Sequence, residues 1–285
     1  MSAKKHAFLL FTKAPAPGVT KTRLTVARGG IFTPEEAADF YRASLLDVAE
    51  LGFQALAELN QVARAGANGD TPDRYDFVVS CSPEADQAIL EALFAENGPW
   101  PAPMLFINDH GKTFDEHFDN AFQQLFTQGY HSVVSIGGDL PSMPVSHIVQ
   151  AFQWLEYYDS YSQQGGFVQA PCQECGVSLV GYTSKTPMDS IGVFYNLDGV
   201  PALDAYIAKA AERSVPVANL TPVADVDDTR DLAHTISLLK ATAYSIHCQP
   251  GLFLARRTLD WIHRTGVVIS TPPNAEHDPR ERIDA

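Results

Sequence analysis

The sequence predicts an α/β fold in which a mainly parallel sheet is covered by helices on both sides. Short continuous apolar runs, typical of strands buried on both faces, alternate with longer segments whose apolar residues recur at helical spacing. The first four alternations contain no β-hairpin signal. Parallel neighbours need helical crossovers, so this order of elements favours a parallel sheet.

Length and composition indicate an ordinary globular protein. The chain has 285 residues, of which 45% are hydrophobic and 19% are charged. Neither an internal repeat nor a strong linker divides the sequence. We therefore expect a single domain over residues 1–270, followed by a loose polar tail over residues 271–285.

The predicted elements follow one another regularly along the chain. Strands are expected at residues 7–12, 75–81, 104–107, 132–136, 177–182 and 215–220. Helices are expected to begin near residues 33, 83, 113, 145, 203, 228 and 252. Three helices have start signals: Thr33 and Thr113 each precede a glutamate by three residues, as in a capping box, and Asp228 is a suitable N-cap.

The overall charge excludes several classes of function. The formal net charge is −14 and the isoelectric point is near 4.9, so a general nucleic-acid binder is not expected. The apolar runs are too short for a signal peptide or a membrane-spanning helix. Four cysteines are too few for a disulfide scaffold. We expect a cytoplasmic protein that has no membrane partner.

The loop after the first strand carries the strongest functional signal. It begins at Ala14, is stiffened by Pro15 and Pro17, and contains Gly18, which permits a positive φ. The candidate phosphate donors that follow are Lys21, Thr22 and Arg23. The spacing is not that of a Walker loop.

Basic residues gather around this loop. The first 28 residues contain six bases and no acid, although the chain as a whole is acidic. These bases are Lys4, Lys5, Lys13, Lys21, Arg23 and Arg28. A solvated basic terminus is one explanation for such a run. The proximity of the Pro/Gly loop favours a second explanation, a phosphate-binding role.

Acidic residues follow two other predicted strands. Asp139 lies in the sequence GGDLP, and Asp225 and Asp227 lie in DVDD before a predicted helix. Each acid alone is explained as well by a turn or a helix cap. In an open parallel sheet, however, ligands bind at the carboxyl ends of the strands. Two separated carboxylates near a phosphate loop are what Mg²⁺ needs to bridge to phosphates.

These segments together resemble a known family. KAPAPGVTKTRL, GGDLP and DVDDTRDL are similar to motifs of a bacterial family of glycosyltransferase A-like (GT-A) proteins, one branch of which is associated with arsenosugar biosynthesis. That family is grouped with the nucleotide-diphospho-sugar transferases, which include phospholactate and molybdenum-cofactor guanylyltransferases. The resemblance implies a three-layer α/β/α sandwich, a nucleotide on the first loop, and a divalent metal held by Asp139 and Asp227.

Two stretches depart from the pattern of that family. Where the family usually has QGxDLGERM, this chain has HGKTFDEHF, which keeps Gly111 and Glu116. Where the family usually has DGGYxLxG, this chain has ECGVSLVG, which keeps an acid, Glu174, and the glycine Gly176. The resemblance implies that Gly111 and Gly138 help to bind the nucleotide and that Glu174 and Gly176 help to form the acceptor pocket. The altered second stretch leaves the acceptor open.

Three functions therefore remain open. The leading prediction is Mg²⁺-dependent (or Mn²⁺-dependent) nucleotidyl transfer from an NTP to a small phosphorylated acceptor, with Lys21, Arg23 and Asp139 as catalytic residues. A glycosyltransferase that uses a nucleotide-sugar is the first alternative. A non-catalytic nucleotide-binding or scaffold protein is the second, because the acceptor motif is altered. The oligomeric state, with a homodimer among the options, is also open.

Three other groups of residues favour ordinary structural roles. The sequence contains one CxxC, Cys172 to Cys175, whereas structural zinc sites need four ligands, so pocket-lining residues are expected. His110 and His117 flank the expected cleft without a metal-binding spacing. The cluster Tyr157, Tyr158 and Tyr161 is expected to pack at a helix end, with a partner interface as the alternative.

Overall fold

A seven-stranded sheet forms the centre of the protein in a computed structural model that describes residues 3–67 and 71–270. Its strand order is β3-β2-β1-β4-β6-β5-β7. The strands are β1 (Lys5–Thr12), β2 (Arg74–Cys81), β3 (Met104–Asn108), β4 (Ser132–Gly137), β5 (Phe167–Pro171), β6 (Val177–Thr183) and β7 (Val217–Asn219). The first four strands pair in parallel, as predicted.

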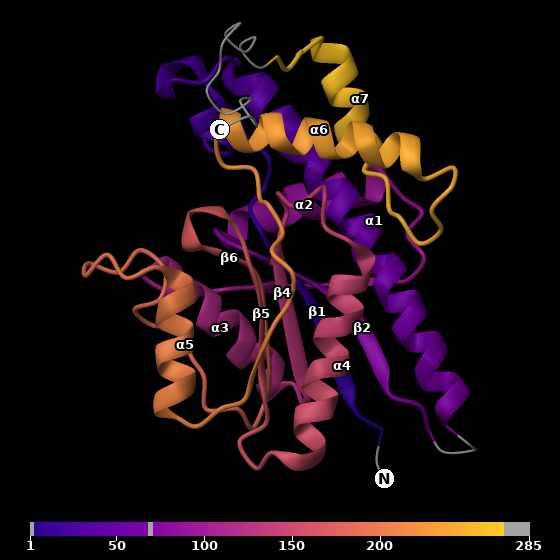
Figure 1. Cartoon of the computed structure of the whole chain (residues 1–285), viewed down its shortest axis with the longest axis vertical. Coiled ribbons are helices and arrows are strands. Elements are labelled where there is room, and N and C mark those ends of the chain that lie inside the picture. Colours follow the sequence, from indigo (N-terminus) through magenta and orange to yellow (C-terminus); the bar gives the residue numbers. More distant parts are fainter. Residues whose placement is uncertain (1–2, 68–70, 271–285) are drawn as a thin grey trace, which may run out of the picture.

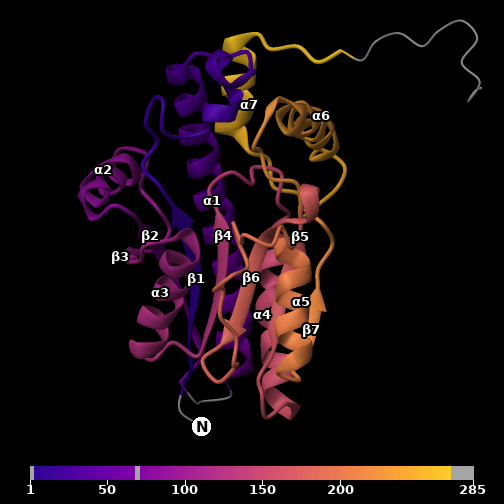
Figure 2. The same ribbon diagram turned by 90° about the vertical axis from the view of Figure 1, so that its left-hand side faces the viewer.

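Helices cover both faces of the sheet (Figures 1 and 2). One apolar core lies between the sheet and the helices α1 (Pro34–Gly66), α2 (Gln87–Glu96) and α4 (Val145–Tyr161). A second core lies between the opposite face and the helices α3 (Phe114–Thr127) and α5 (Ala202–Glu212). The predicted three-layer α/β/α architecture with a mainly parallel sheet is therefore confirmed.

A third apolar cluster lies above the carboxyl ends of the parallel strands. The start of α1 packs there against α6 (Thr229–Ser245) and α7 (Arg256–Thr265), with Trp261 at the centre. In Figure 1 these helices form the top of the molecule, above the ends of β1 and β4. Helices α6 and α7 therefore partly cover the carboxyl edge of the sheet, where ligands are expected.

One strand was not predicted. Strand β5 lies between β6 and β7, pairing antiparallel with β6 and parallel with β7. Its central residue, Gln169, is fully buried and donates a hydrogen bond to Asn219. A polar residue in so short a segment interrupts the apolar run that identified the other strands. Because β6 runs antiparallel to β4, the sheet is mixed rather than wholly parallel.

The helix starts were predicted with one partial error. Thr33 and Asp228 both form complete capping boxes. Thr113 also caps its helix, but the side chain of Glu116 accepts from the backbone N–H of Lys112, not from that of Thr113. The prediction of a reciprocal box at α3 is therefore wrong, because the preceding residue offers Glu116 a donor.

Several element boundaries differ from the sequence prediction. Helix α7 begins at Arg256, after the Pro250–Gly251 turn, rather than at residue 252. Strand β7 is shorter than the predicted 215–220 and begins after Pro216, which has no N–H to donate. The helix predicted from residue 83 begins with a 3₁₀ turn, Glu84–Asp86, before α2.

The predicted tail, residues 271–285, lies outside the described residues. Among the described residues, no helix has the length and hydrophobicity needed to cross a lipid bilayer.

Candidate functional site

The loops after β1, β4 and β7 meet at the carboxyl edge of the sheet. The ammonium of Lys21 donates to Oδ2 of Asp139 at 2.5 Å and to Oδ1 of Asp227 at 2.9 Å. Arg23 donates to the second oxygen of Asp227 at 3.2 Å. Residues 206 positions apart in the sequence therefore share one ionic cluster.

The first loop is shaped so that Lys21 points back toward the sheet. Gly18 has the predicted positive φ, 73°. Lys21 itself is in the left-handed region, with φ 49°, immediately before a 3₁₀ turn, Thr22–Leu24. Leu24 is fully buried and anchors this turn in the cluster under α6 and α7. The side chain of Ala14 also packs in the core, so only the backbone of that residue is available to a ligand.

Helix α1 holds the turn that carries Asp139. The hydroxyl of Ser44 donates to the carbonyl of Gly138 at 2.9 Å. A Cβ atom at Gly138 would lie 2.7 Å from the side chain of Leu45, so a larger residue would displace the turn. Tyr41, from the same helix, is hydrogen-bonded to Thr12 at 2.7 Å, with its ring 6.0 Å from the ammonium of Lys21.

The acids of the DVDD segment have two different roles, helix capping and pocket lining. Asp228 caps α6, accepting from the backbone of Arg230 and Asp231. The capping explanation is thus correct for Asp228, whereas Asp225 and Asp227 line the pocket. The side chain of Gln173 fixes the position of this segment, because it donates a hydrogen bond to the carbonyl of Asp225 at 2.7 Å. These contacts fix two carboxylates beside Asp139.

Negative charge is in excess at this cluster. Burial raises the pKa of Asp225 to about 7, and the neighbouring charges of Asp139 and Asp227 add to the increase. Burial alone would lower the pKa of Lys21, but the same two carboxylates raise it above its ordinary value. Lys21 is therefore a permanent cation, and Lys21 and Arg23 together supply two positive charges to three carboxyl groups.

The donor set of the cluster fits a divalent cation. Asp139 and Asp227 are close enough to bind one ammonium together, and carboxylate oxygens are the ligands that Mg²⁺ and Mn²⁺ prefer. The pKa of Asp225 is raised first by burial and further by the charges of Asp139 and Asp227, which a bound cation would offset. Over residues 3–67 and 71–270, however, no three His, Cys, Asp or Glu side chains form a preformed cage. The metal assignment to Asp139 and Asp227 stays a prediction.

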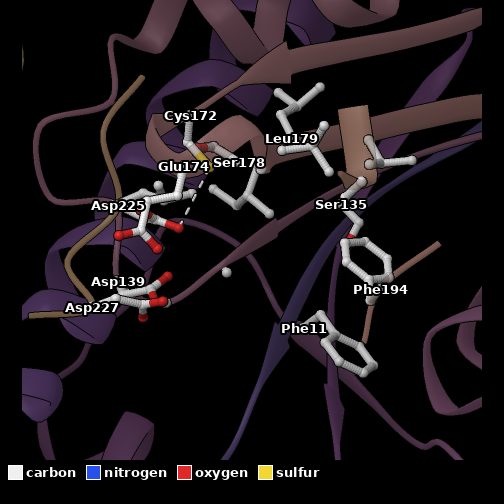
Figure 3. Close-up of a pocket in the computed structure, with 18 of the residues that line it drawn as sticks. Phe11, Ser135, Asp139, Cys172, Glu174, Ser178, Leu179, Phe194, Asp225 and Asp227 are labelled. Carbon is white, nitrogen blue, oxygen red and sulfur yellow. Dashed lines mark hydrogen bonds between the residues drawn. The ribbon is translucent and has the colours of Figure 1, made fainter. Parts of the chain in front are cut away.

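A pocket of about 410 Å³ opens beside the cluster. Figure 3 shows the carboxylates of Asp139, Asp225 and Asp227 at one end and the rings of Phe11 and Phe194 at the other. The predicted site residues that line it are Arg23, Gly138, Asp139, Glu174, Gly176 and Asp227. Its floor is formed by β4 and β6, so it lies on the α3 and α5 side of the sheet.

A second pocket, of about 250 Å³, lies at the carboxyl ends of β1, β2 and β3. It contains Lys13 and Lys112 and shares two residues, Phe11 and Phe114, with the first pocket. Gly111 lies beside it, packed so tightly on α3 that a Cβ atom would lie 2.6 Å from Glu116. The predicted nucleotide residues Gly111 and Gly138 are therefore associated with different pockets.

His117 in the second pocket has a more organised environment than the sequence suggested. Its Nδ1 lies 2.6 Å from Oδ1 of Asp109, which is itself buried and accepts from Ser80 at 2.7 Å. Asp109 follows β3 and Ser80 lies on β2. The signal that could have identified this group is an acid directly after a predicted strand, as at Asp139. His110 is exposed.

The basic residues of the N-terminal segment do not form one island. Lys4 and Lys5 lie at the amino end of β1, the opposite edge of the sheet, where Lys4 pairs with Asp159 at 2.8 Å. The prediction that the six bases gather around the phosphate loop is therefore wrong for Lys4 and Lys5. Strand direction is the reason, because eight residues of extended chain separate Lys4 from the loop.

The remaining candidates have the following places. Cys172 lines the first pocket, its thiol 3.7 Å from Asp225, whereas Cys175 is exposed on the adjacent turn; both are free. Tyr158 is buried in α4, but Tyr157 and Tyr161 are exposed. Side chains of Pro15, Pro17 and Thr22 are not part of either pocket lining.

Comparison with known proteins supplies a family match over part of the chain. The profile of a family described as "Uncharacterized protein conserved in bacteria (DUF2064)" matches residues 68–196. This range contains Asp139, Glu174 and Gly176 but neither the Lys21 loop nor the DVDD segment. No curated protein matches the sequence.

A solved structure decides the fold. The crystal structure of a proposed nucleotide-diphospho-sugar transferase from Desulfovibrio desulfuricans G20 superposes with a TM-score of 0.67 at 22% identity, covering 93% of this chain and 96% of that one. The fold is that of a nucleotide-diphospho-sugar transferase. The resemblance drawn from the motifs is confirmed at this level.

Two further solved structures are more distant. A cytidylyltransferase from Leptospira borgpetersenii has a TM-score of 0.46 at 12% identity, covering 92% of this chain and 95% of that one. A Mycobacterium tuberculosis H37Rv protein in complex with manganese has a TM-score of 0.34 at 12% identity, covering 82% and 98%.

Proposed function

We propose that this protein is a divalent-metal-dependent nucleotidyltransferase that joins the nucleotidyl group of an NTP to a small phosphorylated acceptor. One observation carries the proposal. Two cationic side chains, Lys21 and Arg23, and three carboxyl groups meet at the carboxyl edge of the sheet, at one end of a pocket. The cationic side chains can stabilise a negatively charged leaving group such as pyrophosphate, and the carboxyl groups can hold a divalent cation beside it.

The nucleotide is assigned to the side of the cluster that carries positive charge. Lys13 and Lys112 line the second pocket, and Arg23 lines the first, where Lys21 is bound to the rim carboxylates of Asp139 and Asp227. Cations favour the triphosphate there. The first pocket, which has the acids at its rim, is assigned to the acceptor. Phe11 and Phe114 line both pockets and so lie where the two substrates would meet.

The residues of the cluster have separate roles in the reaction. An oxygen of the ionised acceptor phosphate attacks the α-phosphorus, the bond from that phosphorus to the bridging oxygen breaks, and pyrophosphate leaves. Lys21 and Arg23 donate hydrogen bonds to the leaving pyrophosphate. Asp139 and Asp227 would hold the metal, which when bound supplies further positive charge to the phosphates. An ionised phosphate needs no general base.

Glycosyl transfer from a nucleotide-sugar is the second candidate, and Asp225 is the observation that favours it. A carboxyl group whose pKa is raised to about 7 by burial and by neighbouring acids can accept a proton at neutral pH. A hydroxyl acceptor attacking a sugar carbon must lose such a proton. In that reaction the oxygen–carbon bond to the sugar breaks, and a nucleoside diphosphate leaves.

Product analysis separates these candidates. The full chain is incubated with each NTP or nucleotide-sugar, with sugar phosphates, phospholactate or simple hydroxy acids, and with Mg²⁺, Mn²⁺ or a chelator. Pyrophosphate release that depends on metal and acceptor supports nucleotidyl transfer, and nucleoside diphosphate release supports glycosyl transfer. Metal-dependent nucleotide binding without any product would favour the scaffold alternative and contradict both.

A further inference from the structure

The first pocket has two ends of opposite character. Carboxyl groups gather at the rim, whereas Figure 3 shows Phe11, Phe194 and Ser135 together at the far end. Its floor between these ends is apolar, made by Val177 and Val180 on β6, whose side chains pack on the α3 and α5 side of the sheet. An occupant of the whole pocket must therefore combine a charged group with an apolar body.

Aromatic rings form the walls of the far end. Phe114 meets Phe11 and Phe194 edge to face, with ring centroids 5.5 and 5.0 Å apart. Phe194 also contacts Phe118, at 5.5 Å. Phe114 is 36% exposed although it belongs to this cluster. The cluster therefore presents free ring surface to the pocket, onto which another ring can stack.

Polar groups are scarce on the pocket floor. The hydroxyl of Ser178 is already committed, because it donates to the carbonyl of Val223 at 2.7 Å. The hydroxyl of Ser135 is buried, and among the described residues it has no hydrogen-bond partner. A buried hydroxyl without a partner is costly. Ser135, which is 1% exposed and lines the pocket, thus offers one hydrogen bond to an occupant.

We propose that the acceptor is a phosphorylated compound with a flat apolar ring, and not a sugar phosphate. The ring would stack among Phe11, Phe114 and Phe194, and one polar substituent of the ring would bond to Ser135. The phosphate would face Arg23 and the divalent cation that the acids of the rim would hold. A sugar would bring several hydroxyls to the aromatic end, where Ser135 offers a free buried hydroxyl, whereas the other buried polar atom without a partner among the described lining residues, Oε1 of Gln173, lies beside Asp225 at the rim. This inference rests on the proposed function, since it assigns the acceptor of that reaction.

Three aryl or sugar monophosphates test the proposal by titration calorimetry on the full chain with Mg²⁺. They are phenyl phosphate, 4-hydroxyphenyl phosphate and glucose 1-phosphate. We expect phenyl phosphate to bind at least about 10-fold more tightly than glucose 1-phosphate, and the 4-hydroxyl group to add about 5-fold. Equal or tighter binding of glucose 1-phosphate would overturn the proposal.

Two variants locate the binding. Phe194→Ala should weaken phenyl phosphate about 10-fold, and Ser135→Ala should remove only the advantage of the 4-hydroxyl group. Tyr157→Ala, an exposed ring on the opposite face of the sheet, is the matched control and should change neither affinity. Effects of equal size in the control, or none in Phe194→Ala, would contradict the assignment to this pocket.

Titrating NTPs into the same variants distinguishes a failure of the acceptor assignment from a failure of the transferase proposal. If the proposed function is correct, Phe194→Ala leaves the affinity for the productive NTP unchanged. A loss of NTP affinity in Phe194→Ala would mean that the rings bind the nucleobase, which overturns the acceptor assignment while the transferase proposal survives. Retained ring selectivity in a chain that binds no NTP or nucleotide-sugar would overturn the transferase proposal itself.

Discussion

The two edges of the sheet each carry an ionic cluster, and the two clusters are balanced differently. At the amino edge the carboxylate of Asp159 lies 2.8, 2.8 and 3.1 Å from Lys4, Lys185 and His131. At the carboxyl edge Lys21 bonds to Asp139 and Asp227, and Arg23 reaches Asp227 alone, while Asp225 has no bond to either cation. The first cluster has surplus cations and the second has surplus acids.

Opposite pKa shifts record this difference. Burial would raise the pKa of Asp159, but hydrogen bonds from Lys185 and Lys4 lower it well below its ordinary value. At the other edge, burial and neighbouring acids raise the pKa of Asp225 to about 7. A carboxylate that its neighbours stabilise contributes to folding. Carboxylates that repel one another cost stability, and such strain is commonly found where a ligand supplies the missing charge.

The largest expected effect is on turnover and distinguishes the two edges. Asp139→Asn should lower transferase activity by at least about 100-fold, because removing a ligand charge costs several kcal/mol of transition-state stabilisation. The matched control is Asp159→Asn, which removes a carboxylate of similar burial 20 residues along the chain. It should retain activity at temperatures where it is folded. Equal losses in both variants would show that Asp139 acts through stability alone.

Nucleotide affinity gives the next largest effect. Replacing Lys21 and Arg23 together with Ala should weaken NTP binding by about 10-fold or more, because each charge-assisted hydrogen bond contributes about 1.5–3 kcal/mol. Calorimetry measures the affinity, and circular dichroism checks the fold. Lys4→Ala is the control from the other edge and should bind normally. An unchanged affinity in the double variant with an intact fold would refute the phosphate role of the loop.

The sequence predicted most of the fold because burial on two faces leaves a clear signal. Strands such as Ser132–Gly137 are continuous apolar or small-residue runs, and α1 and α6 carry complete caps. Strand β5 was missed because Gln169 is buried by pairing with Asn219, a contact between residues 50 positions apart. A long-range hydrogen bond that makes a polar residue acceptable in the core has no local signature.

The candidate site was predicted where residues follow strands and missed where their role depends on packing. Lys21, Asp139 and Asp227 were identified from their positions, and the structure brings them together. Lys4 and Lys21 lie at opposite edges of the sheet because β1 runs between them, and this follows from the sequence only when the direction of the strand is considered. The free hydroxyl of Ser135 could not be recognised, because it depends on neighbours that only the folded chain supplies. Asp109 carried the same positional signal as Asp139, but its pairing with His117 depends on how α3 packs beside the end of β3.

A smaller effect is expected on the pH dependence of stability. The pKa of Asp159 is lower in the folded than in the unfolded state, so its contribution is present at neutral pH and is lost as the pH falls below about 4. Asp159→Asn should therefore lower the free energy of unfolding by about 1–2 kcal/mol at pH 7, a value reduced by the partial exposure of Lys4 and Lys185. Denaturant titrations at a series of pH values, from pH 7 down to the lowest pH at which the protein still folds, measure the difference in free energy of unfolding. The difference should begin to shrink below about pH 4 and go on shrinking as the pH falls. A difference that stays constant over the whole series would contradict the ionic origin.

The smallest expected effect has the opposite sign at the other edge. The pKa of Asp225 is raised in the folded state, so its ionised form costs stability, and the cost is complete above about pH 7. Asp225→Asn should therefore raise the free energy of unfolding by about 1 kcal/mol at pH 8 in a chelator. Glu174→Gln, an exposed acid at the rim of the same pocket, should change it little. With Mg²⁺ the gain should disappear, because the wild-type cluster then gains more from the cation than the variant does. A variant that is less stable in both conditions would mean that Lys21 and Arg23 already neutralise the cluster, and that the surplus of acids is not what prepares this edge for a ligand.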